Sequence, residues 1–197
     1  MIAFRPEHPT ADAAGIEALY DTTFGPGHFA KTAERLREYS RSIPSVSHVA
    51  EKAGMIVGVC RVWPVRVGAS PALFYGPVAV APAEQGNRLG LTVTRLALDA
   101  GREQNWPAAV LIGAPEYFGE IGFQSVPADR FVFPGPQDQG RIMARALAGD
   151  WAPLAGAVTA APDLAGNTGL SDLHVATQSV GKASPEAPLR SLATVAG

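Results

Sequence analysis

A short glycine-bearing loop, residues 81–90, stands at the centre of this chain between a β-rich segment and a long amphipathic helix. It reads Ala-Pro-Ala-Glu-Gln-Gly-Asn-Arg-Leu-Gly. A loop of this kind points several backbone N–H groups at one place, and the N-terminus of the following helix adds partial positive charge there. Such a place favours a phosphate or a pyrophosphate. The sequence therefore predicts an anion site at a strand–loop–helix junction.

Four helices are expected from apolar spacing and capping residues. The longest should cover 89–104, because five apolar residues fall on one helical face: Leu89, Val93, Leu96, Ala97 and Ala100. A first helix should end near Phe24, with Thr10 as its N-cap and Ile16, Leu19 and Tyr20 buried. A second should cover 31–42, and a short one 116–121 should stop at Gly122.

The extended segments lie on both sides of the loop and are rich in valine. They are expected at 2–5, 48–52, 55–67, 72–80, 108–112, 130–133 and 141–147, with a further extended segment from Phe123. Pro64 predicts a bulge or a kink within its strand. The apolar run 108–112 suits a strand that is buried on both faces.

Length and composition exclude several classes of protein. A chain of 197 residues is long enough for one well-buried domain, and a net charge of −2 gives no indication of nucleic acid or acidic lipid as a partner. The single Cys60 excludes an intrachain disulfide, and the histidines lack metal-ligand spacing, so no metal is expected. No signal peptide or membrane span is expected, and the predicted location is cytoplasmic.

Composition changes toward the C-terminus. From about residue 148 the chain becomes rich in Ala, Gly, Pro, Ser and Thr, and beyond Asp172 no periodic apolar pattern remains. We expect one domain over 1–165 and a flexible tail over 166–197.

Several short segments, in this order along the chain, resemble the GNAT superfamily of acetyl-CoA-dependent N-acyltransferases. Residues 85–90 match its Gln/Arg-x-x-Gly-x-Gly/Ala loop, 78–82 its "Leu-Ala-Val-x-Pro" strand end, and 117–123 its "Tyr-x-x-x-Gly-Phe" segment. Residues 113–118 are similar to the "Gly-Asp-Pro-x-Tyr-Tyr" run of the YhbS-like branch. Residues 59–68 and 154–158 are also similar to corresponding segments of that branch. The resemblance covers about residues 2–158.

The resemblance implies an α/β (α+β) fold: a central mixed, mostly antiparallel twisted sheet of six to seven strands, flanked by about four helices. The strand 72–80 should splay from the strand 108–112. Acetyl-CoA is then the implied co-substrate, with its pantetheine arm on the first strand and its pyrophosphate on the loop amides. The implied cofactor-binding residues are Val78, Ala79, Val80, Gln85, Gly86, Asn87, Arg88, Leu89, Gly90 and Leu91.

The chain departs from the family pattern at two positions. Arg88 stands at the middle glycine of the loop, where it could crowd the phosphate or turn outward and pair with it. Phe118 stands where many members have the tyrosine that protonates the departing thiolate. Tyr117, one residue earlier, is the remaining candidate for a general acid, and a packed aromatic role is equally open.

The general base is harder to place. Glu51 and His28 are the candidates, the first on the preceding hairpin and the second beside a glycine-rich turn, and a solvated surface role is the competing interpretation for both. Cys60, in a valine-rich strand, is expected to be a buried hydrophobe rather than a nucleophile.

The first functional hypothesis is an N-acetyltransferase that moves an acetyl group to a primary amine by direct attack, with the amide near Val78 stabilising the oxyanion. The second is a catalytically lapsed acyl-CoA-binding or sensor module. A nucleotide-binding protein is a third, although the loop lacks the P-loop and dinucleotide motifs. The acceptor, a small molecule or a peptide, is not identified, and a homodimer through exposed sheet edges is an open alternative.

Overall fold

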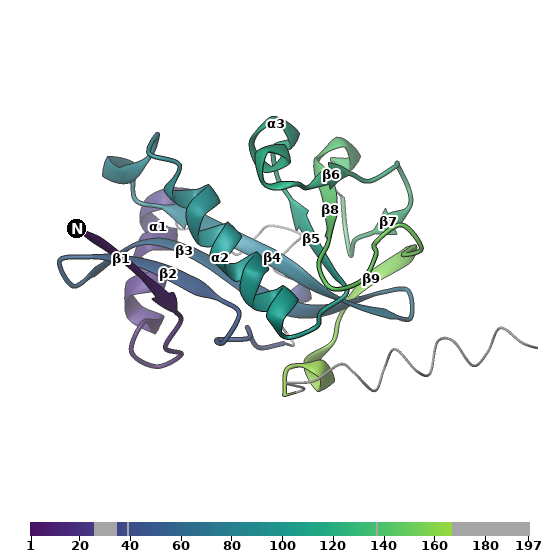
Figure 1. The fold of residues 1–197 in the computed structure, drawn as a ribbon, viewed down its shortest axis with the longest axis horizontal. Helices are drawn as coiled ribbons and strands as arrows, with labels where there is room; N and C mark the ends of the chain where they lie inside the picture. The colour runs from purple at the N-terminus through teal and green to yellow at the C-terminus, as the bar shows by residue number, and fades with distance from the viewer. Residues whose placement is uncertain (26–34, 39, 137, 167–197) are drawn as a thin grey trace, which may run out of the picture.

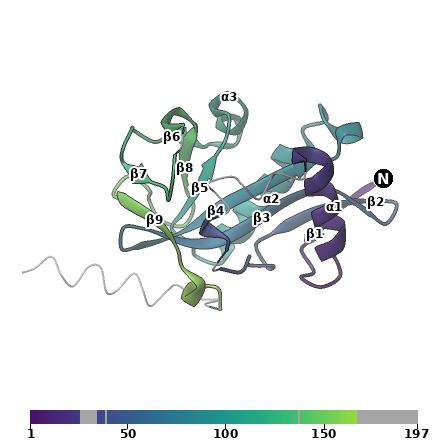
Figure 2. The same cartoon turned by 180° about the vertical axis from the view of Figure 1, so that it is seen from behind.

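The computed structural model describes residues 1–25, 35–38, 40–136 and 138–166. One mixed sheet forms its centre, with α2 on one face and α1 on the other (Figures 1 and 2). The α-helices are α1 (Ala13–Phe24), α2 (Leu89–Glu103) and α3 (Pro115–Phe118). The strands are β1 (Ile2–Pro6), β2 (His48–Lys52), β3 (Met55–Val67), β4 (Ser70–Val80), β5 (Ala108–Ile112), β6 (Gln124–Ser125), β7 (Phe131–Val132), β8 (Ile142–Ala146) and β9 (Gly156–Ala160).

The fold class expected from the sequence is confirmed. The strand order is β1-β2-β3-β4-β5-β8-β6, and β9 pairs with both β3 and β7. The pairings β4–β5 and β7–β9 are parallel, and the others in the described chain are antiparallel. The described sheet has nine strands rather than six to seven. β6 and β7 lie within the extended segments expected from Phe123 and at 130–133. β9 is the strand that was not expected, because its residues carry too little apolar alternation.

The sheet divides at β4 and β5. Among the described strands, these two pair at Leu73–Ala109 and Phe74–Val110, and β4 then continues for six residues to Val80 without β5 beside it. Figure 1 shows β5 turning away from β4. The expected splay is therefore present, and it leaves one edge of the second half of β4 unpaired.

A bulge lies where β4 leaves β5, and not at Pro64 as predicted. Cys60 pairs with Val78 and Val62 with Tyr75, so the two residues Gly76 and Pro77 oppose the single Arg61. Pro64 keeps its register with Leu73, and its carbonyl accepts the Ala161 N–H. Its nitrogen therefore faces β9, where no hydrogen bond to β4 is lost.

Helix α1 begins two residues later than predicted. Its N-cap is Asp12 rather than Thr10, and the Asp12 side chain makes no capping hydrogen bond. That carboxylate instead binds the Arg5 guanidinium at 2.7 and 2.8 Å and accepts the His8 N–H at 2.7 Å. Ile16, Leu19 and Tyr20 are buried as expected.

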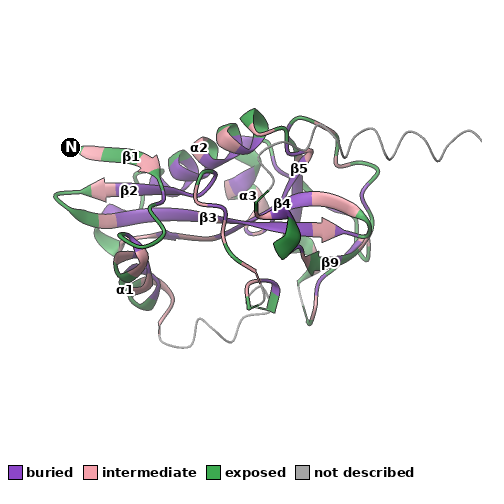
Figure 3. Ribbon diagram, turned by 90° about the horizontal axis from the view of Figure 1, so that it is seen from below, coloured by how far each residue is buried: buried purple, intermediate pink, exposed green. Residues whose placement is uncertain are grey.

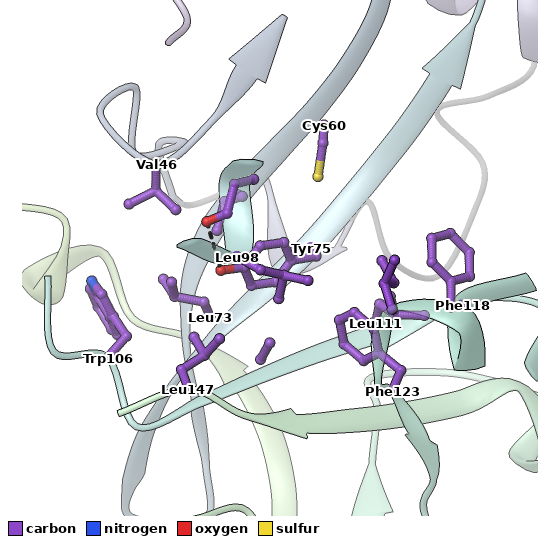
Figure 4. Packing of buried hydrophobic residues seen from close by; sticks show 14 of the residues in the cluster. Val46, Cys60, Leu73, Tyr75, Leu98, Trp106, Leu111, Phe118, Phe123 and Leu147 are labelled. Atoms are coloured by element: carbon purple, nitrogen blue, oxygen red, sulfur yellow. Dashed lines mark hydrogen bonds between the residues drawn. The ribbon is translucent and has the colours of Figure 1, made fainter. Parts of the chain in front are cut away.

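Helix α2 buries a face slightly rotated from the predicted one. Leu89, Val93 and Ala97 are buried as expected, but Leu96 and Ala100 are half-buried, and Leu98 is fully buried in their place. The main core packs between this helix and the sheet (Figure 4), and β3 is buried along nearly its whole length (Figure 3). α2 thus holds the loop against β4.

The remaining predictions concern the short helix and two less defined segments. α3 and the 3₁₀ turn Gly119–Ile121 match the predicted short helix, which ends at Gly122 with a φ of +83°. Of the predicted helix 31–42, the described residues 35–38 and 40–42 contain no α-helix, and Arg35 and Leu36 lie in a 3₁₀ turn. The predicted tail lies outside the described residues, apart from Gly166.

In the described part, no helix has the length and apolarity that crossing a membrane requires.

Candidate functional site

The loop between β4 and α2 is built from a 3₁₀ turn and two left-handed residues. The turn Pro82–Glu84 follows β4, Gly86 has a φ of +85° and Arg88 a φ of +57°. Arg88 is the N-cap of α2, and its side chain makes no capping hydrogen bond. The helix therefore begins without side-chain acceptors for its first N–H groups.

The backbone donors of this loop converge on an open pocket. Within the described chain, no backbone carbonyl accepts the N–H groups of residues 86–91. The pocket beside them has a volume of about 270 Å³. It is lined by Val80, Glu84, Gln85, Gly86, Arg88, Leu89, Gly90 and Tyr117. Unpaired donors, an α2 N-terminus and free space together favour an anion.

The second half of β4 offers further backbone groups beside this pocket. The Ala81 N–H donates to the Val57 carbonyl, so Ala79, two residues earlier, also faces β3. Val78 and Val80 therefore face away from β3, toward the side that β5 has left. The backbone groups of Val78 and the Val80 N–H are placed to bond an extended ligand as an added strand would, while the Val80 carbonyl accepts a hydrogen bond from Gln85 Nε2 at 3.1 Å.

The structure brings together most of the residues predicted to bind the cofactor. Six of the ten line the pocket. Of the other four, Val78 lies next to Gly90, Ala79 is buried against α1, Asn87 is exposed and the Leu91 side chain is in the core. The sequence analysis missed Glu84, although it stands within the loop. Its carboxylate pairs with Lys52 Nζ at 2.5 Å, so its negative charge in the pocket is compensated.

Arg88 turns outward across the mouth of the pocket. Its guanidinium pairs with the Glu120 carboxylate in the turn that follows α3. The Arg88 side chain is 71% exposed and that of Glu120 40%. Of the two expectations for Arg88, the structure shows the outward one, with Glu120 as its partner.

Tyr117 reaches back from α3 over the first turn of α2. Its hydroxyl lies so close to Gly90 that a Cβ at that position would stand 2.7 Å from the oxygen. The Leu91 N–H lies near the same oxygen. Burial raises the pKa of Tyr117 above its ordinary value, while the Leu91 N–H opposes this rise. The hydroxyl therefore stays protonated at neutral pH.

Phe118 is a core residue and does not line the pocket. Its ring packs edge-on against Tyr117 and Phe123, with centroid distances of 5.0 and 6.2 Å, beside Leu111 (Figure 4). It also fills the space next to Gly113, where a Cβ would lie 2.4 Å from the ring. The position that carries the family's tyrosine therefore serves packing in this chain.

Neither Glu51 nor Cys60 lines the pocket. Glu51, on β2, accepts two hydrogen bonds from Arg5, at 2.9 and 3.2 Å, and does not line the pocket. His28 lies outside the described residues. Cys60 is fully buried, and burial raises the pKa of its thiol to about 12. The described residues contain no group of three or more His, Cys, Asp or Glu side chains that could hold a metal ion.

Comparison with known proteins places this geometry among acyltransferases. A model of the acetyltransferase (GNAT) family matches residues 13–123, more than half of the chain. No curated protein matches the sequence.

Solved structures of the same family share the fold. The GNAT family N-acetyltransferase YhbS from Escherichia coli, solved in complex with CoA, is 26% identical, with a TM-score of 0.70 over 81% of this chain and 89% of that one. A GNAT acetyltransferase from Brucella melitensis, in complex with acetyl-CoA, is 27% identical, with a TM-score of 0.55 over 73% and 95%. The ribosomal-protein-S18-alanine N-acetyltransferase of E. coli, at 16% identity and a TM-score of 0.55 over 78% and 99%, is similar in fold alone.

Proposed function

The chain belongs to the GNAT acetyltransferase family, and we propose that it transfers the acetyl group of acetyl-CoA to a primary amine by direct attack. The observation that carries this proposal is the pocket at the N-terminus of α2, where six consecutive backbone N–H groups lack a backbone acceptor beside an unpaired stretch of β4. The two complexes described above support CoA or acetyl-CoA as its ligand.

In this proposal the backbone binds the co-substrate. The N–H groups of residues 86–91 receive the pyrophosphate, and Val78 and Val80 bond the amide groups of the pantetheine arm as an added strand. The thioester then lies in the gap between β4 and β5. Because recognition is mainly through the main chain, Arg88 can replace a glycine without removing the donors.

The chemical step needs few side chains. The neutral amine attacks the thioester carbonyl, and the Val78 N–H stabilises the oxyanion. The C–N bond forms, the C–S bond breaks with its electron pair on sulfur, and the nitrogen loses a proton to solvent. Phe118 carries no proton, so we propose that solvent protonates the thiolate. A thiolate is a good leaving group, and the missing acid slows the reaction without preventing it.

The proton of the incoming ammonium must also be removed. Glu51 stays the predicted base, although Arg5 engages its carboxylate. Glu51→Gln tests this role: a base predicts a lower rate with its largest effect below pH 7, and a structural role predicts an unchanged pH profile and lower thermal stability.

The acceptor class, a small molecule or a peptide amine, is open. The comparisons give no support to the alternative of a lapsed acyl-CoA sensor, which the same experiments test. We would titrate the protein calorimetrically with acetyl-CoA and CoA, using NAD as the comparator, and then screen amines by CoA release. Binding of both CoA compounds but not NAD, with turnover of an amine, is the expected result. Absence of CoA binding at millimolar concentration contradicts the proposal, and binding without turnover of any amine supports the lapsed alternative.

Substitutions at Arg88 separate its charge from its backbone conformation. Arg88→Ala removes the charge and keeps a non-glycine residue at a φ of +57°. Arg88→Gly also relieves the left-handed strain, which costs a non-glycine residue about 1 kcal/mol. Both variants should bind acetyl-CoA up to about fivefold more weakly, as for an exposed ion pair, and the glycine variant alone should melt at a higher temperature.

The control is Arg95→Ala, which removes another exposed arginine, further along α2. It should change neither the affinity for acetyl-CoA nor the melting temperature. Equal acetyl-CoA affinity in the wild type and in both Arg88 variants would show that Arg88 does not meet a phosphate.

A further inference from the structure

Among the described residues that line the pocket, Tyr117 alone comes from outside the segment 80–90. It comes from α3, on the other side of the gap, and its ring is fixed by edge-on contact with Phe118 at 5.0 Å. Its hydroxyl reaches the first turn of α2, where Gly90 and Leu91 are. The hydroxyl is therefore held at the place where backbone donors converge, rather than at the middle of the β4 edge.

The hydrogen bonding of this hydroxyl decides where its proton can go. A phenol has one proton to donate. The nearest backbone group of α2, the Leu91 N–H, is itself a donor and cannot receive that proton. Among the residues described, no side-chain or backbone acceptor takes it. The O–H is thus left to bond whatever occupies the pocket.

We propose that Tyr117 binds the diphosphate of the co-substrate, with its hydroxyl donating a hydrogen bond to a phosphate oxygen. The inference rests on the proposed function and assigns Tyr117 a different role from that of a general acid. The Tyr117 hydroxyl adds one donor to the backbone N–H groups at the N-terminus of α2. The ligand is then held both by the loop that follows β4 and by α3, which follows β5.

This role also explains Gly90. The residue is helical and has no positive φ, so its backbone conformation does not demand glycine. The demand comes from the Tyr117 hydroxyl, which a Cβ would approach to 2.7 Å, whereas the next contacts, with Val80 and Val78, would be at 3.4 and 3.6 Å. Gly90 is required to seat Tyr117.

The test is a comparison of three donors with the full-length wild type and Tyr117→Phe. Acetyl-CoA carries the diphosphate and the 3′-phosphate, acetyl-dephospho-CoA carries the diphosphate alone, and S-acetylpantetheine carries neither. Dissociation constants are measured by calorimetry, and by NMR titration for the weakest ligand. Tyr117→Phe should weaken both diphosphate donors about tenfold, as expected for a hydrogen bond to a charged group, and leave S-acetylpantetheine unchanged.

Each other pattern overturns the assignment. Equal weakening of all three donors would place Tyr117 at the pantetheine arm or the thioester. Weakening of acetyl-CoA alone would place it at the 3′-phosphate. Unchanged affinity with a fall in kcat at saturating donor would make it a general acid. If the wild type itself binds no CoA compound, the proposed function fails, which is a different result from any effect of Tyr117→Phe.

A double-mutant cycle checks the geometry independently. Gly90→Ala should weaken acetyl-CoA in the wild type and have much less effect in Tyr117→Phe, because the atom it would meet is gone. If glycine were needed only for approach of the ligand to the backbone, Gly90→Ala would have the same effect in both backgrounds. That outcome would contradict the seating of Tyr117 on Gly90.

Discussion

Arg88 and Gly90 stand two positions apart in the loop, and the backbone makes different demands on them. Arg88 adopts a left-handed conformation that glycine would adopt without strain, yet it is an arginine and pairs with Glu120. Gly90 has ordinary helical geometry and is required by a neighbouring side chain. At the residue scale, a loop residue can thus be constrained by its own backbone conformation or by atoms from elsewhere in the fold. The first constraint depends on the neighbouring sequence, and the second depends on the tertiary structure.

Asp12 gives a pH-dependent prediction at the same scale. Its bond to Arg5 lowers the pKa of its carboxyl below the ordinary 3.8. Since the folded state holds its proton less tightly than the unfolded chain, the carboxylate stabilises the fold above about pH 4. This contribution is lost as the pH falls through the lowered value.

We expect Asp12→Asn to be less stable than the wild type at pH 7, with the difference shrinking toward pH 2. Urea unfolding over that range measures it. The control is Asp163→Asn, whose Arg66 pair is exposed and should contribute much less. A constant difference at all pH values would contradict the assignment of the effect to titration of Asp12.

At the scale of elements, α2 lies close to the sheet because one of its residues lacks a side chain. The Tyr75 hydroxyl of β4 reaches under the helix and donates to the Ala97 carbonyl at 3.2 Å. Figure 4 shows this bond within the main core. A Cβ on Gly101 would stand 2.5 Å from the same hydroxyl. The contact fixes the distance between α2 and β4, and with it the position of the loop between them.

Gly101→Ala should therefore destabilise the protein by about 1–3 kcal/mol through overpacking, although alanine favours a helix by about 1 kcal/mol. Adding Tyr75→Phe should recover part of the loss. Thermal or denaturant unfolding measures both effects. Gly119→Ala is the matched control, because a Cβ there would meet nothing within 4 Å. A Gly101→Ala variant as stable as the wild type would show that the helix can move away from the sheet at no cost.

At the scale of the whole molecule, the sheet is two halves joined at two residue pairs. The first half carries β1 to β4, and the second carries β5, β8 and β6. β9 crosses the join, because it pairs with β3 in the first half and with β7 beside the second. β9 therefore helps to hold the two halves together, and the pocket lies near the place where they separate.

The domain boundary at residue 165 stays a prediction, since the described chain ends at Gly166. If residues 166–197 form the flexible tail that their composition predicts, truncation after Gly166 should leave the melting temperature within about 2 °C and acetyl-CoA affinity unchanged.

Truncation after Ala155 is the comparison. It removes β9 and the fully buried Val158, and should abolish cooperative unfolding or lower the melting temperature strongly. A large loss after truncation at 166 would mean that the C-terminal segment packs on the domain, and would move the boundary.

Much of the fold could be predicted because it depends on short-range patterns. Valine-rich alternation located β2, β3 and β4, and helical spacing located α1 and α2. The extended segments expected from Phe123 and at 130–133 contain the strands β6 and β7. β9 was not predicted, because Val158 is the one strongly apolar residue in it and a single such residue gives no alternation. The bulge was predicted at Pro64 and lies at Gly76–Pro77, since register depends on the partner strand.

For the candidate site, the sequence by itself determined where the loop lies and that its backbone N–H groups form a candidate anion site. This was possible because the donors at a helix N-terminus come from one contiguous run of residues. Only the tertiary structure decided which side chains meet that loop. Tyr117, Glu120 and Lys52 reach it from elements more than 25 residues away, and Phe118 turns into the core instead. Adjacent positions on a short helix point in different directions, and the packing against β5 and Phe123 fixed which of the two aromatic rings faces the pocket.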